Sequence, residues 1–252
     1  MTPFVRPRPV DRPALRLIGF HHAGGSSTAY YPMGRAIPDD WELLLLDLPG
    51  RAKRYHEPPM EHIDDVVDLA LADVEPWLDV PVALFGHSYG AIVATEVARK
   101  LCDTGRPPLW TGVSGRVSPG YRTQRRLSEL DDLGLLQQIR AMGGLPEQLD
   151  EVPEFVARFT RLTRADLRSV ESYRPPADRT PLSCPLTVFC GTDDLWAPPA
   201  AMSGWSAESV HEVRRRVFPG GHFYFLGSSF AGFTRELVAE IEAAAAPVMV
   251  NG

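Results

Sequence analysis

One pentapeptide constrains the fold of this chain more than any other feature. Residues 86–90 read Gly-His-Ser-Tyr-Gly, with an apolar run of β type before them at 82–85 and a helix-forming run after them. This context predicts a tight strand-to-helix turn with a strained serine, in which side chains at Gly86 or Gly90 would collide with neighbouring backbone. The turn exposes the hydroxyl of Ser88 at the start of a helix, where the dipole favours developing negative charge. The alternative is a glycine-rich turn with an incidental serine, because G-x-S-x-G alone is common.

Short apolar runs alternate with amphipathic segments along the chain, which is the pattern of a mostly parallel sheet covered by helices. In the segment at 60–78, apolar residues recur at steps of three and four and form one core-facing stripe, and Pro76 should end or bend this helix. The expected class is α/β, with helices on both faces of the sheet. We expect strands at residues 15–20, 42–48, 82–85, 109–114, 186–190 and 213–218, and helices at 60–78, 90–102 and 228–245.

The segment at about 116–174 departs from this alternation. It has helical patterns at 127–142 and 153–173 and no convincing strand. A helical insertion between two strands of an open sheet lies at the carboxyl ends of the strands, where ligands bind. We therefore expect a single domain over residues 1–252 with a helical lid at about 116–174, and a chain of this length can bury a substantial core.

A serine nucleophile needs a base within hydrogen-bond reach. Only His211 and His222 follow Ser88 in the sequence. His222 comes after a strand end and a Gly-Gly turn, just before the final helix, whereas His211 lies in a polar stretch that leads into the preceding strand. We expect His222 to be the base.

The base in turn needs an acceptor on its other ring nitrogen. Asp193 and Asp194 both lie just past the carboxyl end of the strand at 186–190. We favour Asp194, which is three residues after the turn glycine, and expect Asp193 to cap the turn or face solvent. The order serine, acid, histidine along the chain is that of the α/β-hydrolase fold, with its mostly parallel central sheet.

The segment after the first strand is a candidate oxyanion hole, because His21 and His22 are followed by Ala-Gly-Gly with unhindered backbone N–H groups. We expect the first donor to be the N–H of Ala23 and the second to be the N–H of Tyr89, immediately after the nucleophile. Adjacent histidines also occur in metal sites, but no carboxylate or cysteine lies at ligand spacing, so we expect no metal.

Composition excludes several other classes. Net charge is −6, which argues against nucleic acid as the main ligand, and no run approaches the ~20 apolar residues that span a bilayer. The arginine- and proline-rich N-terminus lacks the apolar segment of a secretory signal. Three cysteines, Cys102, Cys184 and Cys190, form no metal pattern and are expected to be small buried hydrophobes in a reducing compartment. We expect a cytoplasmic, free-standing chain.

With these residues in place, the chain resembles the type II thioesterases, free-standing editing enzymes of polyketide and nonribosomal peptide synthesis. The similarity extends from about Leu15 to Leu237, and the co-occurrence of its motifs is far more specific than any one of them. The motifs are His22-Ala-Gly-Gly25, Leu48-Pro-Gly-Arg51-Ala-Lys-Arg54, Phe85-Gly-His-Ser-Tyr-Gly-Ala91, Thr95-Glu-Val-Ala-Arg99, Leu162-Thr-Arg-Ala-Asp166 through Glu171-Ser-Tyr173, and Gly220-Gly-His-Phe-Tyr-Phe-Leu226.

The resemblance implies the triad Ser88, Asp194 and His222, which agrees with the choice made from the residues. It implies an acyl substrate bound as a thioester to the phosphopantetheine arm of an acyl or peptidyl carrier protein domain, with no further cofactor and no need for more than a monomer. The family usually has methionine in place of Tyr89, so we expect the tyrosine ring to alter the acyl pocket while leaving the N–H donor unaffected.

Lid side chains offer two further hypotheses, each with a plainer alternative. Four apolar residues would line an acyl channel, or pack the lid onto the core: Leu133, Leu136, Ile139 and Met142. Four arginines form one helical stripe: Arg158, Arg161, Arg164 and Arg168. The stripe would dock an acidic carrier protein or its phosphate, but we favour a solvated face with internal ion pairs, for example to Asp166.

Two other functions compete with the thioesterase hypothesis. One is another esterase or acyltransferase of the same fold, or the releasing domain of a synthase. The other is a non-catalytic binding protein on a hydrolase scaffold, which we disfavour because such proteins typically lose the nucleophile or the base.

Overall fold

The computed structural model describes residues 2–121, 126–145, 152–176 and 178–249. Its centre is a seven-stranded sheet with the order β1-β3-β2-β4-β5-β6-β7, in which β1 is antiparallel to β3 and the other neighbours are parallel. The strands are β1 (Phe4–Val5), β2 (Leu15–Phe20), β3 (Trp41–Leu46), β4 (Val82–His87), β5 (Trp110–Ser114), β6 (Leu186–Gly191) and β7 (Arg214–Phe218). The helices are α1 (Ile63–Val74), α2 (Tyr89–Asp103), α3 (Asp132–Ala141), α4 (Pro153–Ser172) and α5 (Phe230–Met249).

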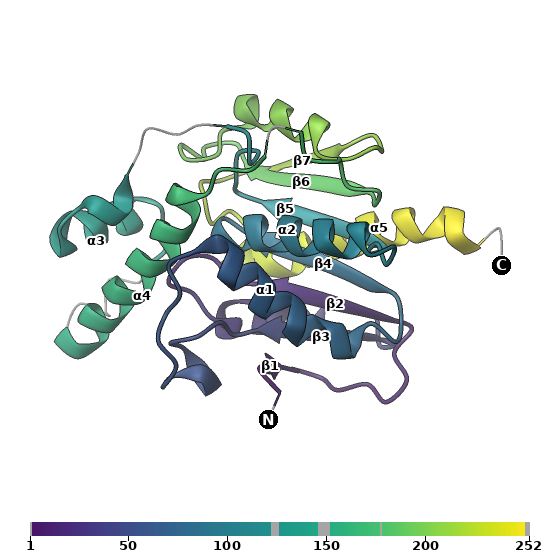
Figure 1. The fold of residues 1–252 in the computed structure, drawn as a ribbon, viewed down its shortest axis with the longest axis horizontal. Coiled ribbons are helices and arrows are strands. Elements are labelled where there is room, and N and C mark those ends of the chain that lie inside the picture. Colours follow the sequence, from purple (N-terminus) through teal and green to yellow (C-terminus); the bar gives the residue numbers. More distant parts are fainter. Residues whose placement is uncertain (1, 122–125, 146–151, 177, 250–252) are drawn as a thin grey trace.

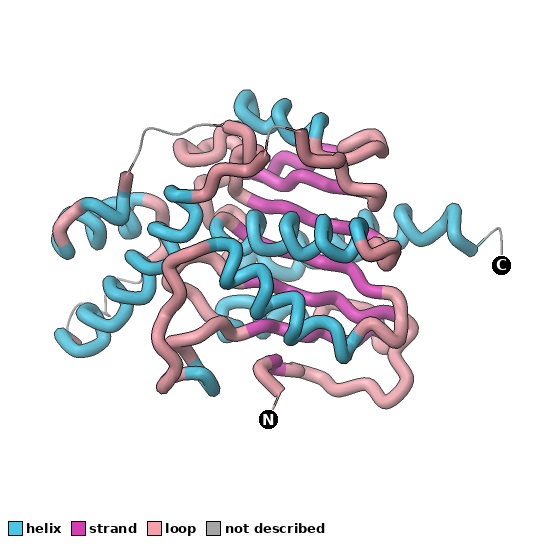
Figure 2. Tube along the Cα trace, in the orientation of Figure 1, coloured by secondary structure: helices cyan, strands magenta, loops and turns pink. Residues whose placement is uncertain are grey.

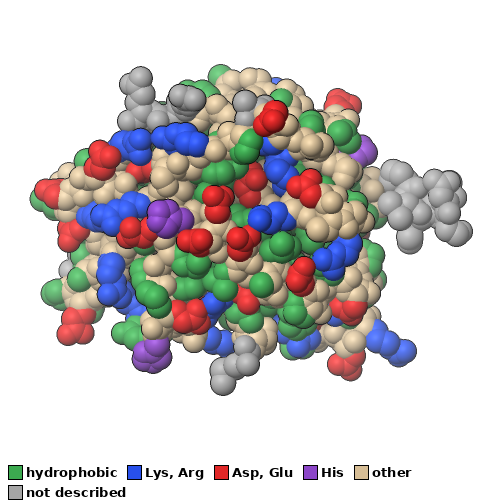
Figure 3. Space-filling view, viewed as in Figure 1, with side chains coloured by type: hydrophobic (Ala, Val, Ile, Leu, Met, Phe, Trp, Pro, Cys, Tyr) green, Lys and Arg blue, Asp and Glu red, His purple; other side chains and the backbone are tan. Residues whose placement is uncertain are grey.

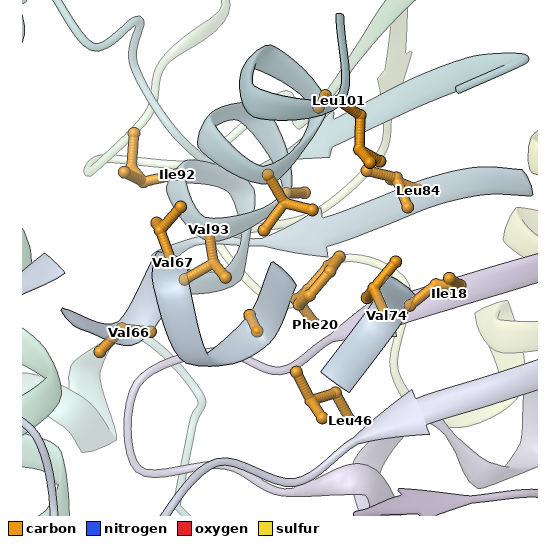
Figure 4. Close-up of a cluster of buried hydrophobic side chains, with 14 of the residues drawn as sticks. Ile18, Phe20, Leu46, Val66, Val67, Val74, Leu84, Ile92, Val93 and Leu101 are labelled. Atoms are coloured by element: carbon orange, nitrogen blue, oxygen red, sulfur yellow. The ribbon is translucent and has the colours of Figure 1, made fainter. Parts of the chain in front are cut away.

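Helices cover both faces of the sheet. Helices α1 and α2 lie on the near face in Figure 1 and α5 lies behind the sheet. Figure 4 shows the near-face core, where Val66 and Val67 of α1 and Ile92 and Val93 of α2 pack with strand residues such as Leu84. The far face packs strand residues against α5. The predicted α/β class, with a mostly parallel sheet between helices, is confirmed.

Most of the expected elements are present with small shifts at their ends. Helix α1 begins at Ile63 and ends at Val74, where a single 3-10 turn (Glu75–Trp77) containing Pro76 follows, because proline cannot donate the next helical hydrogen bond. Figure 2 shows that α3 and α4 lie beyond one end of the sheet, on the side where α2 begins. The helical segments expected within residues 116–174 are therefore found, and they lie beside the carboxyl ends of the strands.

Several short elements were not anticipated. Strand β1 has only two residues, too few for an alternating pattern, and it is placed by pairing with Leu45 and Leu46 of β3. The other elements are the 3-10 segments Ser27–Arg35, Ala52–Arg54 and Pro199–Ala207, and Pro32 lies inside the first of them, where it disfavours a regular α-helix.

Candidate active site

The turn after β4 has the strained geometry that the pentapeptide predicts. Ser88 has φ 55° and ψ −110°, and its N–H donates to the carbonyl of Ser114 at 2.7 Å. A Cβ atom at Gly86 would lie 2.0 Å from the carbonyl oxygen of Gly90, and one at Gly90 would lie 2.3 Å from the carbonyl oxygen of Phe20. Both glycines are therefore required by close backbone contact, as expected, and the half-exposed Ser88 precedes the first residue of α2.

The sheet order explains why distant residues meet. Strands β4, β5, β6 and β7 are parallel neighbours, so their carboxyl ends lie along one edge. Ser88 follows β4, Gly115 follows β5, Asp194 follows β6 and His222 follows β7. Ser88 and His222 line one cavity of about 230 Å³, together with Gly115.

His222 is held by a buried carboxylate. Its Nδ1 atom lies 2.9 Å from Oδ2 of Asp194, and the two side chains are 4% and 0% exposed. The other carboxylate oxygen of Asp194 accepts the backbone N–H groups of Trp196 and Ala197, at 2.8 and 3.0 Å. Asp193 is exposed, so the structure pairs the histidine with the aspartate that we favoured.

These contacts explain the ionisation of the acid. Burial by itself would raise the pKa of Asp194, but the hydrogen bond and charge of His222 and the two backbone N–H groups outweigh burial and hold the pKa below its usual value. Asp194 is therefore an anion at neutral pH. An anion at Nδ1 fixes the ring tautomer with Nε2 as the basic nitrogen.

His211, the other candidate for the base, lies far from the carboxyl ends of the strands. His211 lines a larger cavity, of about 790 Å³, with Pro81 and Pro185, which precede β4 and β6 at the opposite edge of the sheet. Its Nε2 atom is 3.1 Å from the carbonyl oxygen of Ser183. His211 is thus separated from Ser88 by the length of the strands.

The glycine loop after β2 forms a closed turn. The N–H of Gly25 donates to the carbonyl of His22 at 3.0 Å, and Gly24 has φ 71°, as the third residue of a type II turn requires. The N–H of Gly24 donates to Asp166. Within the described residues, the N–H of Ala23 has no acceptor, and neither has that of Tyr89 at the first position of α2. The two expected oxyanion donors therefore remain available, one at the end of β2 and one after Ser88.

The ring of Tyr89 does not alter the cavity as we expected. It is 1% exposed, belongs to the core under α1 and α2, and stacks on His21 with ring centroids 6.1 Å apart. The ring points away because the first turn of α2 buries this side against the core. Only the backbone N–H of Tyr89 remains available to the site.

Sequence reasoning missed a layer of buried polar groups beneath His222. The imidazole of His87 lies 4.8 Å from that of His222 between centroids, and its Nδ1 is 2.8 Å from Oγ of Ser114, which is 2.7 Å from the hydroxyl of Tyr224. Burial, followed by the charge of His222, lowers the pKa of His87 well below its ordinary value, so this ring adds no positive charge to the site. A polar residue ending β5, a strand next to β4, is the signal that would have found Ser114.

Arg116 was also missed. It follows Gly115 and lines the cavity beside Ser88 and His222, where burial lowers the pKa of its guanidinium despite the opposing effect of the Glu171 charge. Its position one residue past a glycine at a parallel strand's end is a signal that the sequence does carry.

The lid residues proposed for the acyl channel separate into three environments. Met142 lines the cavity, with Leu127, Leu167 and Val170 among the other lining residues. Leu136 and Ile139 are buried in the apolar cluster between α3 and α4, and Leu133 is 62% exposed. For Leu136 and Ile139 the packing alternative describes the structure better, because α3 presents them to α4 rather than to Ser88. The exposed Leu133 fits neither alternative.

The arginine stripe on α4 is mostly engaged in local contacts. Arg164 pairs with Asp132 and Arg168 with Glu61, while the guanidinium of Arg158 lies 3.5 Å from the centroid of Tyr55. Figure 3 shows positive and negative side chains interleaved over this face. Asp166 was expected to pair within the stripe, but it is buried and pairs with a residue outside the lid, because it lies on the opposite side of α4.

No described helix is both long and apolar enough to cross a membrane. Within the same residues, no group of three or more histidine, cysteine, aspartate or glutamate side chains is arranged to hold a metal ion.

Comparisons with known proteins agree with this geometry. The model of the "Thioesterase domain" family matches residues 15–243. A "Probable cadicidin biosynthesis thioesterase" of Streptomyces griseus is 33% identical over 219 residues, which are 87% of this chain but only 60% of that protein, so the chain spans less than two thirds of this relative. "Thioesterase PikA5" of Streptomyces venezuelae is 33% identical over 86% of this chain and 77% of its own length. The solved structure of "the type II thioesterase BorB from the borrelidin biosynthetic cluster" has a TM-score of 0.85 and 31% identity, and covers 94% of this chain and 97% of that one.

Proposed function

Because this chain belongs to the thioesterase domain family, we propose that it hydrolyses acyl groups from the phosphopantetheine thioesters of carrier proteins by way of an acyl-Ser88 intermediate. It is a thioesterase with the α/β-hydrolase fold, and the resemblance to type II thioesterases drawn from its motifs is confirmed. Its substrates would be acyl groups that stall or misprime a synthase, as the biosynthetic clusters named for its relatives suggest. One observation carries the proposal: a single cavity holds Ser88 beside His222, which is bonded to the buried Asp194.

The residues account for each step of the reaction. His222 takes the proton of Ser88 as Oγ bonds to the thioester carbonyl carbon, and the N–H groups of Ala23 and Tyr89 hold the oxyanion, each donor contributing roughly 3 kcal/mol in comparable sites. The C–S bond then breaks and His222 gives its proton to the departing thiol. A water molecule, deprotonated by His222, attacks the acyl-serine, and the proton returns to Ser88 as the acid leaves. Asp194 holds the ring tautomer and stabilises the imidazolium in both halves.

The same proposal defines partners and location. The macromolecular partners are acyl or peptidyl carrier domains, and the reaction requires no metal or organic cofactor besides the phosphopantetheine of the substrate. The chain would act in the cytoplasm, which fits cysteines that are free at Cys102, Cys184 and Cys190. A monomer suffices, because all five groups of the mechanism come from one chain.

The decisive experiment compares hydrolysis of acetyl-, propionyl-, longer-chain and aminoacyl-carrier thioesters with hydrolysis of short oxygen esters. We expect the carrier thioesters to be strongly preferred, and Ser88→Ala to abolish turnover and acyl-enzyme formation while melting as the wild type does. A preference for simple esters would indicate an esterase. Near-normal hydrolysis by the folded Ser88→Ala variant would exclude Ser88 as the nucleophile.

A further inference from the structure

A buried ion pair joins the lid to the loop after β3. Arg51 and Asp166 are 115 residues apart in sequence, yet their side chains are 5% and 2% exposed and meet through two hydrogen bonds. Nη1 of Arg51 donates to Oδ2 of Asp166 at 2.8 Å and Nη2 donates to Oδ1 at 2.9 Å. This is the bidentate geometry in which arginine and carboxylate interact most strongly. None of the steps described above uses either residue.

Both members of the pair also hold the glycine loop. Oδ2 of Asp166 accepts the N–H of Gly24 at 2.8 Å, and Nη1 of Arg51 donates to the carbonyl of Gly25 at 3.0 Å. The first bond fixes the peptide plane between Ala23 and Gly24, and the second fixes the peptide plane between Gly25 and Ser26. Helix α4 also packs closely against this turn, because a Cβ atom at Gly24 would lie 2.1 Å from Oγ1 of Thr163.

The consequence concerns Ala23. The Gly25 N–H is bound to His22 within the turn and the Gly24 N–H is bound to Asp166, whereas the N–H of Ala23 has no acceptor among the described residues. Its direction is set by the adjoining peptide planes, since a chain has only two soft dihedrals per residue. Without the ion pair, the peptide between Ala23 and Gly24 would lose its hydrogen bond to a group outside the turn.

We propose that Arg51 and Asp166 are positioning residues, which aim the N–H of Ala23 at the oxyanion and make the oxyanion hole depend on the seating of lid helix α4. This inference rests on the proposed function. A buried ion pair is weak evidence for a role in stability, because desolvation of both charges opposes their attraction. Its contacts with Gly24 and Gly25 give this pair a second role, which no other buried ion pair among the described residues has.

The test removes both charges together, with Arg51→Gln combined with Asp166→Asn, so that no unpaired buried charge remains. We expect kcat on an acyl-carrier thioester to fall about 10- to 100-fold. This fall is no larger than the one caused by removing a whole oxyanion donor. KM and the affinity for a thioether analogue of the substrate should stay near wild-type values. Affinity for a trifluoromethyl ketone, whose serine adduct carries an oxyanion, should fall in proportion to kcat/KM.

A matched control is the buried pair between Arg16 and Glu42, which joins β2 to β3 with Nε and Oε2 3.0 Å apart. Arg16→Gln with Glu42→Gln should lower the melting temperature but leave kcat and ketone affinity unchanged. Arg51→Lys is the second variant, because lysine keeps the charge but cannot bond two carboxylate oxygens and a carbonyl in one plane. It should lose part of kcat in the same way.

The outcomes separate the two proposals. If the Arg51/Asp166 double variant, or Arg51→Lys where the double variant fails to fold, has wild-type kcat and ketone affinity, the positioning role is wrong. If wild-type protein lacks thioesterase activity, or Ser88→Ala retains it, the proposed function is wrong whatever the pair does. A loss confined to KM and thioether affinity would overturn the positioning role in favour of substrate binding.

Discussion

His222 and Asp194 are joined by a 2.9 Å hydrogen bond between two side chains that are almost completely removed from solvent. The bond links the loops after β7 and β6, which are neighbouring strands. A carboxylate there leaves Nε2 of His222 as the basic nitrogen, and His222 and Ser88 line the same cavity. The catalytic proposal therefore depends on the charge of Asp194, and not only on its volume.

Asp194→Asn tests that dependence. Asparagine keeps the volume but can donate to Nδ1 of His222, which favours the wrong ring tautomer. We expect kcat to fall by about 10³- to 10⁴-fold, as for triads of this kind, with the fold retained by circular dichroism. Asp193→Asn is the matched control, because this neighbouring aspartate is exposed, and it should keep the wild-type rate. Equal activity in both variants would show that the carboxylate has no catalytic role.

Gly115 offers a steric test of the same site. It has φ 59°, and a Cβ atom there would lie 2.4 Å from Cε1 of His87 and 3.2 Å from Cε1 of His222. Gly115→Ala should push the catalytic ring and lower kcat about 10- to 100-fold. Gly105→Ala is the control, since Gly105 has φ 74° but nothing within 4 Å. Gly105→Ala should share only the backbone strain of Gly115→Ala, of about 1–2 kcal/mol. It should keep the wild-type kcat.

Sequence reasoning succeeded where the signal is local. The turn at Ser88 is specified by five residues and the elements on either side of them. Asp194 follows the apolar strand β6, which ends in a glycine, and His222 follows β7 and a Gly-Gly turn. In a parallel sheet, position at a carboxyl end is enough to bring such residues to one edge. The residues proposed for the triad could therefore be named from the sequence before the structure placed them along one edge of the sheet.

Reasoning from sequence failed where the contact is long-range and not periodic. No local signal shows that Asp166 pairs with Arg51 rather than with the arginine stripe on α4. The orientation of Asp166 depends on how α4 packs against the glycine loop. Likewise, Leu136 and Ile139 carry the apolar pattern of any lid helix. Whether such residues face a substrate or another helix is decided by packing angles that the sequence does not encode locally.

The lid assignments can be tested by comparing two of the four apolar candidates. Met142 lines the cavity, whereas Leu133 is 62% exposed on α3. Met142→Ala should lower kcat/KM for medium-chain acyl carriers by about tenfold, the range expected for lost contact in a hydrophobic pocket, with a smaller effect on acetyl. Leu133→Ala should leave the chain-length profile unchanged. A profile that shifts with Leu133 and not with Met142 would place the acyl chain along the outer face of α3.

Because buried histidines stay neutral in the folded protein, the free energy of unfolding should depend on pH even above the range in which the carboxylates titrate. Burial, the largest cause, lowers the pKa values of His21 and His87 well below their ordinary value of 6.5 and lowers the pKa of His22 to about 3. Below pH 6.5 the unfolded chain therefore binds protons that the folded protein excludes, so stability is present above 6.5 and falls as pH falls.

Each of the three histidines should lower the free energy of unfolding by about 1.4 kcal/mol per pH unit below 6.5. Asp194, with its lowered pKa, contributes stability that is lost only below about pH 4, so it adds nothing to the slope between pH 7 and 5. Urea titrations between pH 7 and 5 should show a shallower slope for His87→Gln than for the wild type, by one proton. A wild-type slope near zero would mean that these rings are protonated in the fold, and a charged His87 beside His222 would be incompatible with a neutral catalytic base.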